Sequence, residues 1–290
     1  MIGIRAVLSA AVVPILLVPL VGTRGTDPSA DVAARGLVVS RAERADAALA
    51  ELRTALGPGL DAGRSGAAAV VQGDVPPGPR LEEAAARLAD ARQVAEGVRL
   101  AMFDLEAARR AADPGAAPLE APIAAGELDS IAAQLGETAT AGETFAGMRG
   151  RAEGVTASLD AALAALEAGD LQTAQERAAS ARAHHAALGR WDVDFATFPV
   201  WLETTGEMIG AVEIIIEATQ ANDRTAAARA ATDFAALADR AATADRALRI
   251  ALGEGGAAVT AAPLGRLADL LRRVEQARVS VASILQAVGR

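Results

Sequence analysis

The chain of 290 residues contains no cysteine, no lysine and no tyrosine, and it has two tryptophans and two histidines. Without cysteine it cannot form a disulfide, a thiolate metal site or a cysteine nucleophile. Without lysine it also lacks the residue on which Schiff-base enzymes and phosphate-binding P-loops depend. The exclusive use of arginine as the basic residue is typical of a GC-rich bacterial genome and requires no mechanistic explanation.

Enzyme signatures are also missing. No G-x-S-x-G, H-E-x-x-H, G-x-G-x-x-G or Walker sequence occurs in a suitable context. A glycosidase built on paired carboxylates usually offers aromatic sugar platforms, whereas aromatic residues make up 2% of this chain. The net charge of −9 disfavours a nucleic-acid partner, because phosphate binding needs clustered positive charge. The sequence therefore predicts a non-enzymatic protein without an organic cofactor.

The N-terminal segment, residues 1–22, has the pattern of an export signal or membrane anchor. Arg5 precedes an uncharged run over residues 6–22. This run is at the short end for a membrane-spanning helix, which needs about 20 residues, and Pro14 and Pro19 would kink it. Cleavage and retention both remain open. We expect an extracytoplasmic protein (secreted, periplasmic or membrane-anchored) that contacts the membrane through this segment if it is not cleaved.

Beyond a predicted tether at residues 23–37, the chain carries the pattern of an all-α protein. Apolar residues repeat at alternating spacings of three and four, and no alternating strand pattern is found. This predicts an elongated antiparallel bundle over residues 38–290, with about six to eight helices, Ala-rich heptad-like seams and a possible sub-boundary near 113–125. The expected helices cover residues 38–56, 81–112, 127–135, 140–168, 171–188, 200–220, 224–252 and 263–288.

One window, His184 to Glu217, concentrates the unusual side chains. It holds Trp191, Phe195, Phe198 and Trp201 as well as both histidines. Aromatic side chains are the largest apolar anchors that a chain can bury. They are therefore expected to pin an irregular connection, residues 190–199, against the helices on either side. Any functional site is expected in this window.

Histidines and carboxylates in this window could hold a divalent metal. The candidate ligands are His184, His185, Asp192, Asp194, Glu203 and Glu207. Against this hypothesis, adjacent helical residues point about 100° apart, and His185 falls on the apolar stripe of its helix, where a histidine bonded to a neighbouring helix is expected. The Glu-x-x-His pair of di-metal carboxylate bundles is also absent.

The helix that follows carries an acidic stripe. Glu203, Glu207, Glu213 and Glu217 fall on one side, with the apolar residues opposite. The stripe is either a solvated face or the lining of a cation site. A surface facing a partner or ligand is predicted at Trp191, Trp201, Glu213 and Glu217.

Two functional hypotheses follow. The leading one is an exported or membrane-tethered helical scaffold that acts through protein partners. The alternative is an extracytoplasmic metal- or small-solute-binding protein that uses the window from His184 to Glu217.

Overall fold

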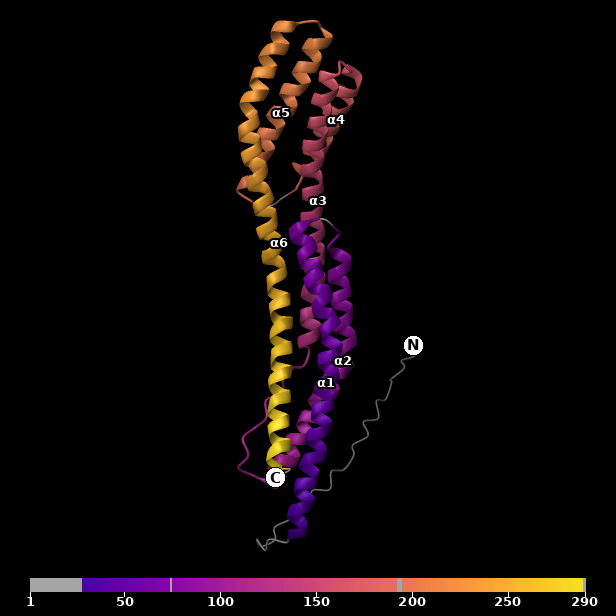
Figure 1. Ribbon diagram of the computed structural model, residues 1–290, viewed down its shortest axis with the longest axis vertical. Helices are drawn as coiled ribbons and strands as arrows, with labels where there is room; N and C mark the ends of the chain where they lie inside the picture. Colours follow the sequence, from indigo (N-terminus) through magenta and orange to yellow (C-terminus); the bar gives the residue numbers. More distant parts are fainter. Residues whose placement is uncertain (1–27, 74, 192–194, 289–290) are drawn as a thin grey trace, which may run out of the picture.

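A computed structural model describes residues 28–73, 75–191 and 195–288 (Figure 1). In this part of the chain there are six helices and no strand, which confirms the all-α bundle. The predicted N-terminal signal or anchor lies outside the described residues. The helices are α1 (Pro28–Gln72), α2 (Gly78–Ala112), α3 (Glu127–Glu167), α4 (Leu171–Leu188), α5 (Thr197–Gln220) and α6 (Arg224–Val288).

The helices form a rod made of two four-helix bundles stacked end to end (Figure 1). In the basal half, α1 and α2 pack against the first part of α3 and the last part of α6. In the distal half, α4 and α5 pack against the rest of α3 and the first part of α6. Since α6 has 65 residues, it is about 98 Å long at 1.5 Å per residue. The two continuous helices, α3 and α6, join the halves.

The structure corrects the predicted limits of the first helix. Residues 28–37, expected as part of a tether, are helical and largely exposed, and the core begins at Val38. The Gly-Pro-Gly sequence at 57–59 follows the expected end of this helix at residue 56 but lies inside α1, as does most of the stretch between the expected helices 38–56 and 81–112. Glycines in this stretch reflect close packing: a Cβ at Gly63 would lie 2.6 Å from Leu264, and one at Gly66 would lie 2.7 Å from Leu81.

Two predicted pairs of helices are single helices. The expected break between residues 135 and 140 is absent from α3, and the Gly-Glu-Gly-Gly sequence at 253–256 does not end α6. A Cβ at Gly255 would lie 2.9 Å from the ring of Phe195, and one at Gly256 would lie 2.6 Å from Val70. These two glycines therefore allow neighbouring residues to pack closely against α6 at the junction between the halves. They do not end the helix.

Pro263 also lies inside α6, although proline cannot donate a helical hydrogen bond. The carbonyl that loses its donor belongs to Val259, four residues earlier. The hydroxyl of Thr138 on α3 lies 3.3 Å from this oxygen and 2.7 Å from the carbonyl of Gln134. A buried threonine from the neighbouring helix thus helps to satisfy the carbonyl that Pro263 frees, which helps α6 to continue.

Two side chains of α3 hold the turn between α1 and α2 at the junction. Arg149 donates to the carbonyls of Val70 and Val71, at 3.3 and 2.8 Å, and so covers the C-terminal end of α1. Glu143 accepts from the backbone N–H of Gly78, at 2.9 Å, at the start of α2. A cation at a helix C-terminus and an anion at a helix N-terminus both complement the helix dipole.

The α3–α4 and α5–α6 turns in the distal half follow one scheme. Gly169 and Asn222 adopt positive φ angles of 75° and 59° and end α3 and α5. The next residues cap the following helices: Asp170 accepts from the N–H of Thr173, and Asp223 accepts from those of Thr225 and Ala226. The hydrogen bonds with Thr173 lower the pKa of Asp170, because they stabilise its carboxylate.

Gly253 and Gly256, two of the three glycines in the 253–256 sequence, offer a matched test of the packing at the junction. We expect Gly256→Ala to destabilise the protein by about 1–3 kcal/mol, because its Cβ would overlap Val70 and force a shift. Gly253→Ala should instead stabilise it by about 0.5–1 kcal/mol, since a Cβ there meets nothing within 4 Å. Urea unfolding of both variants measures the difference, and equal midpoints would contradict the close contact.

Candidate functional site

The connection between α4 and α5 lies where the two halves meet. The ring of Phe195 packs against that of Phe145 on α3, with centroids 5.9 Å apart. Trp191 covers Gly147 of α3, where a Cβ would lie 2.9 Å from the indole. Trp191 and Phe195 therefore hold the two described ends of this connection against α3 and α6, whereas contacts with the helices on either side of it were predicted. Asp192 and Asp194 lie outside the described residues.

His185 is bonded to the neighbouring helix, as its place on the apolar stripe predicts. Its ring stacks on that of Trp201, with centroids 6.4 Å apart and an interplanar angle of 23°. Its Nε2 lies 2.7 Å from the carbonyl oxygen of Leu202. A carbonyl oxygen only accepts hydrogen bonds, so the ring donates from Nε2, and Nδ1 is the nitrogen that keeps a lone pair.

His184 points to a different neighbour. Its ring lies over Gly154 of α3, where a Cβ would come within 3.1 Å of the imidazole. The two histidines therefore contact different helices, α3 and α5, and do not converge on one point.

The acidic stripe of α5 is paired across helices at two of its four members. Glu213 pairs with Arg182 of α4, and Glu207 lies 3.5 Å from Arg240 of α6. The hydrogen bond with Glu213 raises the pKa of Arg182, so that guanidinium stays charged. Glu203 and Glu217 are exposed. Across the described residues, no group of three or more histidines and carboxylates is placed to hold a metal ion.

The residues predicted to face a partner differ in their exposure. Trp201 is completely buried and Trp191 is half-buried, whereas Glu217 is exposed and Glu213 is half-buried in its ion pair. The opposite side of α5 lies in the distal core, with Val212 and Ile216 buried. The structure therefore distributes the window between core and surface rather than gathering it into one site.

A groove that sequence reasoning missed lies between the start of α5 and the facing stretch of α6. We call it the α5–α6 groove. It has a volume of about 540 Å³, and its walls are largely apolar. Its lining residues are Ala196, Thr197, Val200, Thr204, Asp239, Arg240, Thr243, Ala244 and Ala247. Thr197 and Thr204 lie seven residues apart and thus on one face of α5.

Smaller hollows flank the loop between α2 and α3, residues 113–126, where a sub-boundary is predicted. This loop lies within the basal half, between Phe103 of α2 and Ser280 of α6. Leu100 and Phe103 are exposed beside it.

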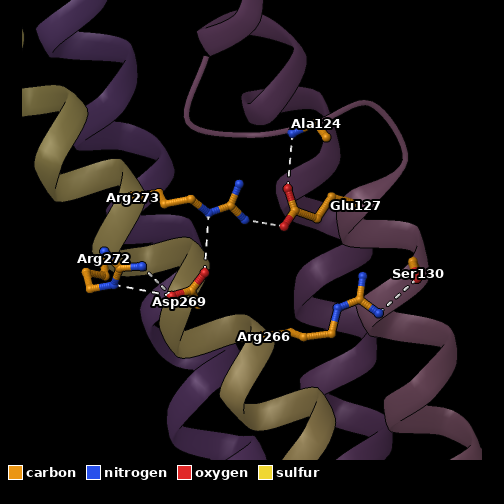
Figure 2. A network of polar contacts seen from close by, with 7 residues as sticks. All are labelled: Ala124, Glu127, Ser130, Arg266, Asp269, Arg272 and Arg273. Atoms are coloured by element: carbon orange, nitrogen blue, oxygen red, sulfur yellow. Dashed lines mark hydrogen bonds and ion pairs between the residues drawn. The ribbon is translucent and has the colours of Figure 1, made fainter. Parts of the chain in front are cut away.

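Polar contacts fix the end of this loop to α6 (Figure 2). Glu127 accepts from the N–H of Ala124 at 3.1 Å and pairs with Arg273. Nearby, Arg266 donates to the hydroxyl of Ser130 at 3.2 Å. Arg273 also lies 3.7 Å from Asp269 on its own helix, so these contacts join the start of α3 to α6.

No known protein family, curated protein or solved structure matches the chain significantly. The function is therefore inferred from the geometry of the described residues. Among the features of the described residues, the α5–α6 groove combines volume, apolar walls and a buried hydroxyl without a partner.

Proposed function

We propose that the chain is an exported or membrane-tethered helical scaffold that acts through protein partners and has no enzymatic activity. The observation that carries this proposal is the continuity of α3 and α6 through both halves. The start of α1 lies at one end of the rod, and the α3–α4 and α5–α6 turns lie at the other (Figure 1). A rod of this kind can hold a binding surface several nanometres from its point of attachment.

The interior supports a structural role. The buried polar residues of the described chain are four threonines, and no charged side chain is buried there. Catalytic sites usually contain titratable groups whose pKa is shifted by burial or by neighbouring charges. An interior packed with alanine, leucine and valine instead supports a structural role, in which the core keeps the rod stiff.

In this proposal, residues 6–22 direct export of the protein or attach it to the membrane. In the described part of the chain, no helix is both long and apolar enough to cross a membrane. A fusion of alkaline phosphatase, which is active only outside the cytoplasm, to the C-terminus tests the location. We expect activity with the full chain and none without residues 1–22. Equal activity of the two fusions, or none with the full chain, would contradict export.

Partner binding is tested in cells that naturally produce the protein. Because the chain has no cysteine, single variants at exposed positions along the rod, such as Phe103→Cys and Ile214→Cys, accept one photoreactive maleimide each. A scaffold should give covalent adducts with another protein at one or more of these positions. The absence of protein adducts along the whole rod would refute it.

The metal-binding alternative has a separate measurement. The purified protein is analysed for metal, and its thermal unfolding is recorded before and after a chelator. A stoichiometric metal whose removal lowers the midpoint would favour metal binding over the scaffold.

A further inference from the structure

The α5–α6 groove is formed by one face of each of its two helices. Thr197, Val200 and Thr204 of α5 are spaced by three and four residues, and so are Arg240, Thr243 and Ala247 of α6. Seven helical residues span about 10 Å, so the groove runs along about two helical turns. Its length and its two helical walls suit a third helix rather than a compact ligand.

Two hydroxyl groups in the groove lack partners. Thr204 lines the groove, and its hydroxyl makes no hydrogen bond with any described residue. The hydroxyl oxygen of Thr197 is fully buried and has no hydrogen-bond partner. By contrast, Thr205 and Thr219 of the same helix donate to the carbonyls four residues earlier, at 2.7 and 2.6 Å. A buried hydroxyl without a partner is unfavourable, which points to a group from outside the described chain.

Exposed apolar side chains accompany the groove. Val200 is 54% exposed within it. Ile250, which is 55% exposed, lies one turn beyond Ala247 on the same face of α6. The small residues Ala244 and Thr243 leave room for the backbone of another helix to approach closely.

The charges differ between the two edges. Helix α5 carries four glutamates and no basic residue, and the exposed Glu203 and Glu207 each follow a groove-lining residue, Val200 or Thr204, by three positions. The α6 side carries Asp239, Arg240 and Arg246, of which Arg240 already pairs with Glu207. The α5 edge is therefore negative, and Glu203 has no partner in the described chain.

We propose that the α5–α6 groove binds an amphipathic helix of a partner protein. That helix presents small apolar residues to Val200 and Ala247, a polar side chain to Thr204, and arginine or lysine to the acidic edge at Glu203. This inference rests on the proposed scaffold function, for which it names the docking surface and the class of partner.

The first test is photo-crosslinking with the full chain in cells that naturally produce it. Val200→Cys and Ala247→Cys are labelled with benzophenone maleimide, with Ile214→Cys as the control. Ile214 is 51% exposed on the same helix and lies about 21 Å beyond Val200. We expect protein adducts at the two groove positions and several-fold fewer at the control. The adducted segment should have apolar residues spaced by three and four, flanked by basic ones.

The second test measures binding directly. A fluorescent peptide with the sequence of the adducted segment is titrated with purified protein and followed by anisotropy. We expect Thr204→Val to weaken binding by about three- to tenfold, because a buried hydrogen bond is lost. Glu203→Arg should weaken it by about tenfold through charge reversal. Glu217→Arg reverses an exposed charge elsewhere on α5 and should leave the affinity unchanged. Circular dichroism confirms that each variant is folded.

Several outcomes would overturn the inference. These are adducts with lipid or with a second copy of this chain, equal labelling at Ile214, or peptide binding that is insensitive to Thr204 and Glu203. Protein adducts at Phe103→Cys or Ile214→Cys, without any at the two groove positions, would refute the groove as the docking surface. They would still support the scaffold function. The absence of protein adducts at every position would refute both the groove as a docking surface and the scaffold function.

Discussion

Replacing Ala181 by Asp is expected to lower the free energy of unfolding by about 3 kcal/mol or more. Ala181 lies on α4 and is fully buried in the core of the distal half. An unpaired carboxylate in such a place either loses its hydration or must take up a proton, and both are costly. No charged side chain is buried among the described residues, so no buried cation is available to pair with the carboxylate.

Ala183→Asp is the matched control, because residue 183 lies on the same helix and is exposed. Its effect should stay within about 0.5 kcal/mol, as is usual for surface substitutions. Thermal unfolding followed by circular dichroism compares the two variants with the unchanged protein. If Ala181→Asp melted like the control, the seam of α4 would face solvent and the distal core would be wrongly assigned.

The seams themselves could be predicted from the sequence. Leu81, Leu88, Val98 and Leu105, which repeat at helical spacing in residues 81–112, are all fully buried in the basal core. This succeeds because the signal is local: residues three and four apart lie on one face of a helix whatever the rest of the chain does. The two aspartate caps, Asp170 and Asp223, are predictable for the same reason.

The helix ends could not be predicted where a glycine or proline is accommodated by packing against residues that are distant in the sequence. Gly255 admits Phe195, which lies 60 residues earlier in the chain, and Thr138 supports the carbonyl freed by Pro263 from more than 100 residues away. Local propensity treats both residues as breakers. Only the packed neighbours show that Gly255 permits close approach and that the carbonyl freed by Pro263 has a donor.

The candidate site was predicted in part. The bonded state of His185 follows from its place on the apolar stripe, and the structure bears this out. The groove was missed because alanine and threonine are common on both cores and surfaces, so their pattern carries little information. The unpaired hydroxyl of Thr204 becomes visible only when the hydrogen bonds of its neighbours are known.

Replacing Trp201 by Ala is expected to destabilise the protein by about 3–5 kcal/mol, the usual cost of truncating a buried tryptophan. Trp201 is fully buried, and its indole stacks on His185 beside the aromatic connection. Its loss leaves a cavity where α4 and α5 meet, and the rigid backbone of α5 can close this cavity only partly. Val200→Ala changes the adjacent, half-exposed residue and should alter stability by about 0.5 kcal/mol or less.

The Trp201 variant also tests whether the two halves unfold together, because Trp191 remains as the single tryptophan. Its fluorescence reports on the junction, whereas circular dichroism reports on all helices. Since α3 and α6 run through both cores, urea should produce coincident transitions by the two probes. A fluorescence transition at clearly lower urea would mean that the distal half unfolds alone. In that case the continuity of α3 and α6 would not make the rod one cooperative unit, and the argument for a stiff scaffold would lose its main support.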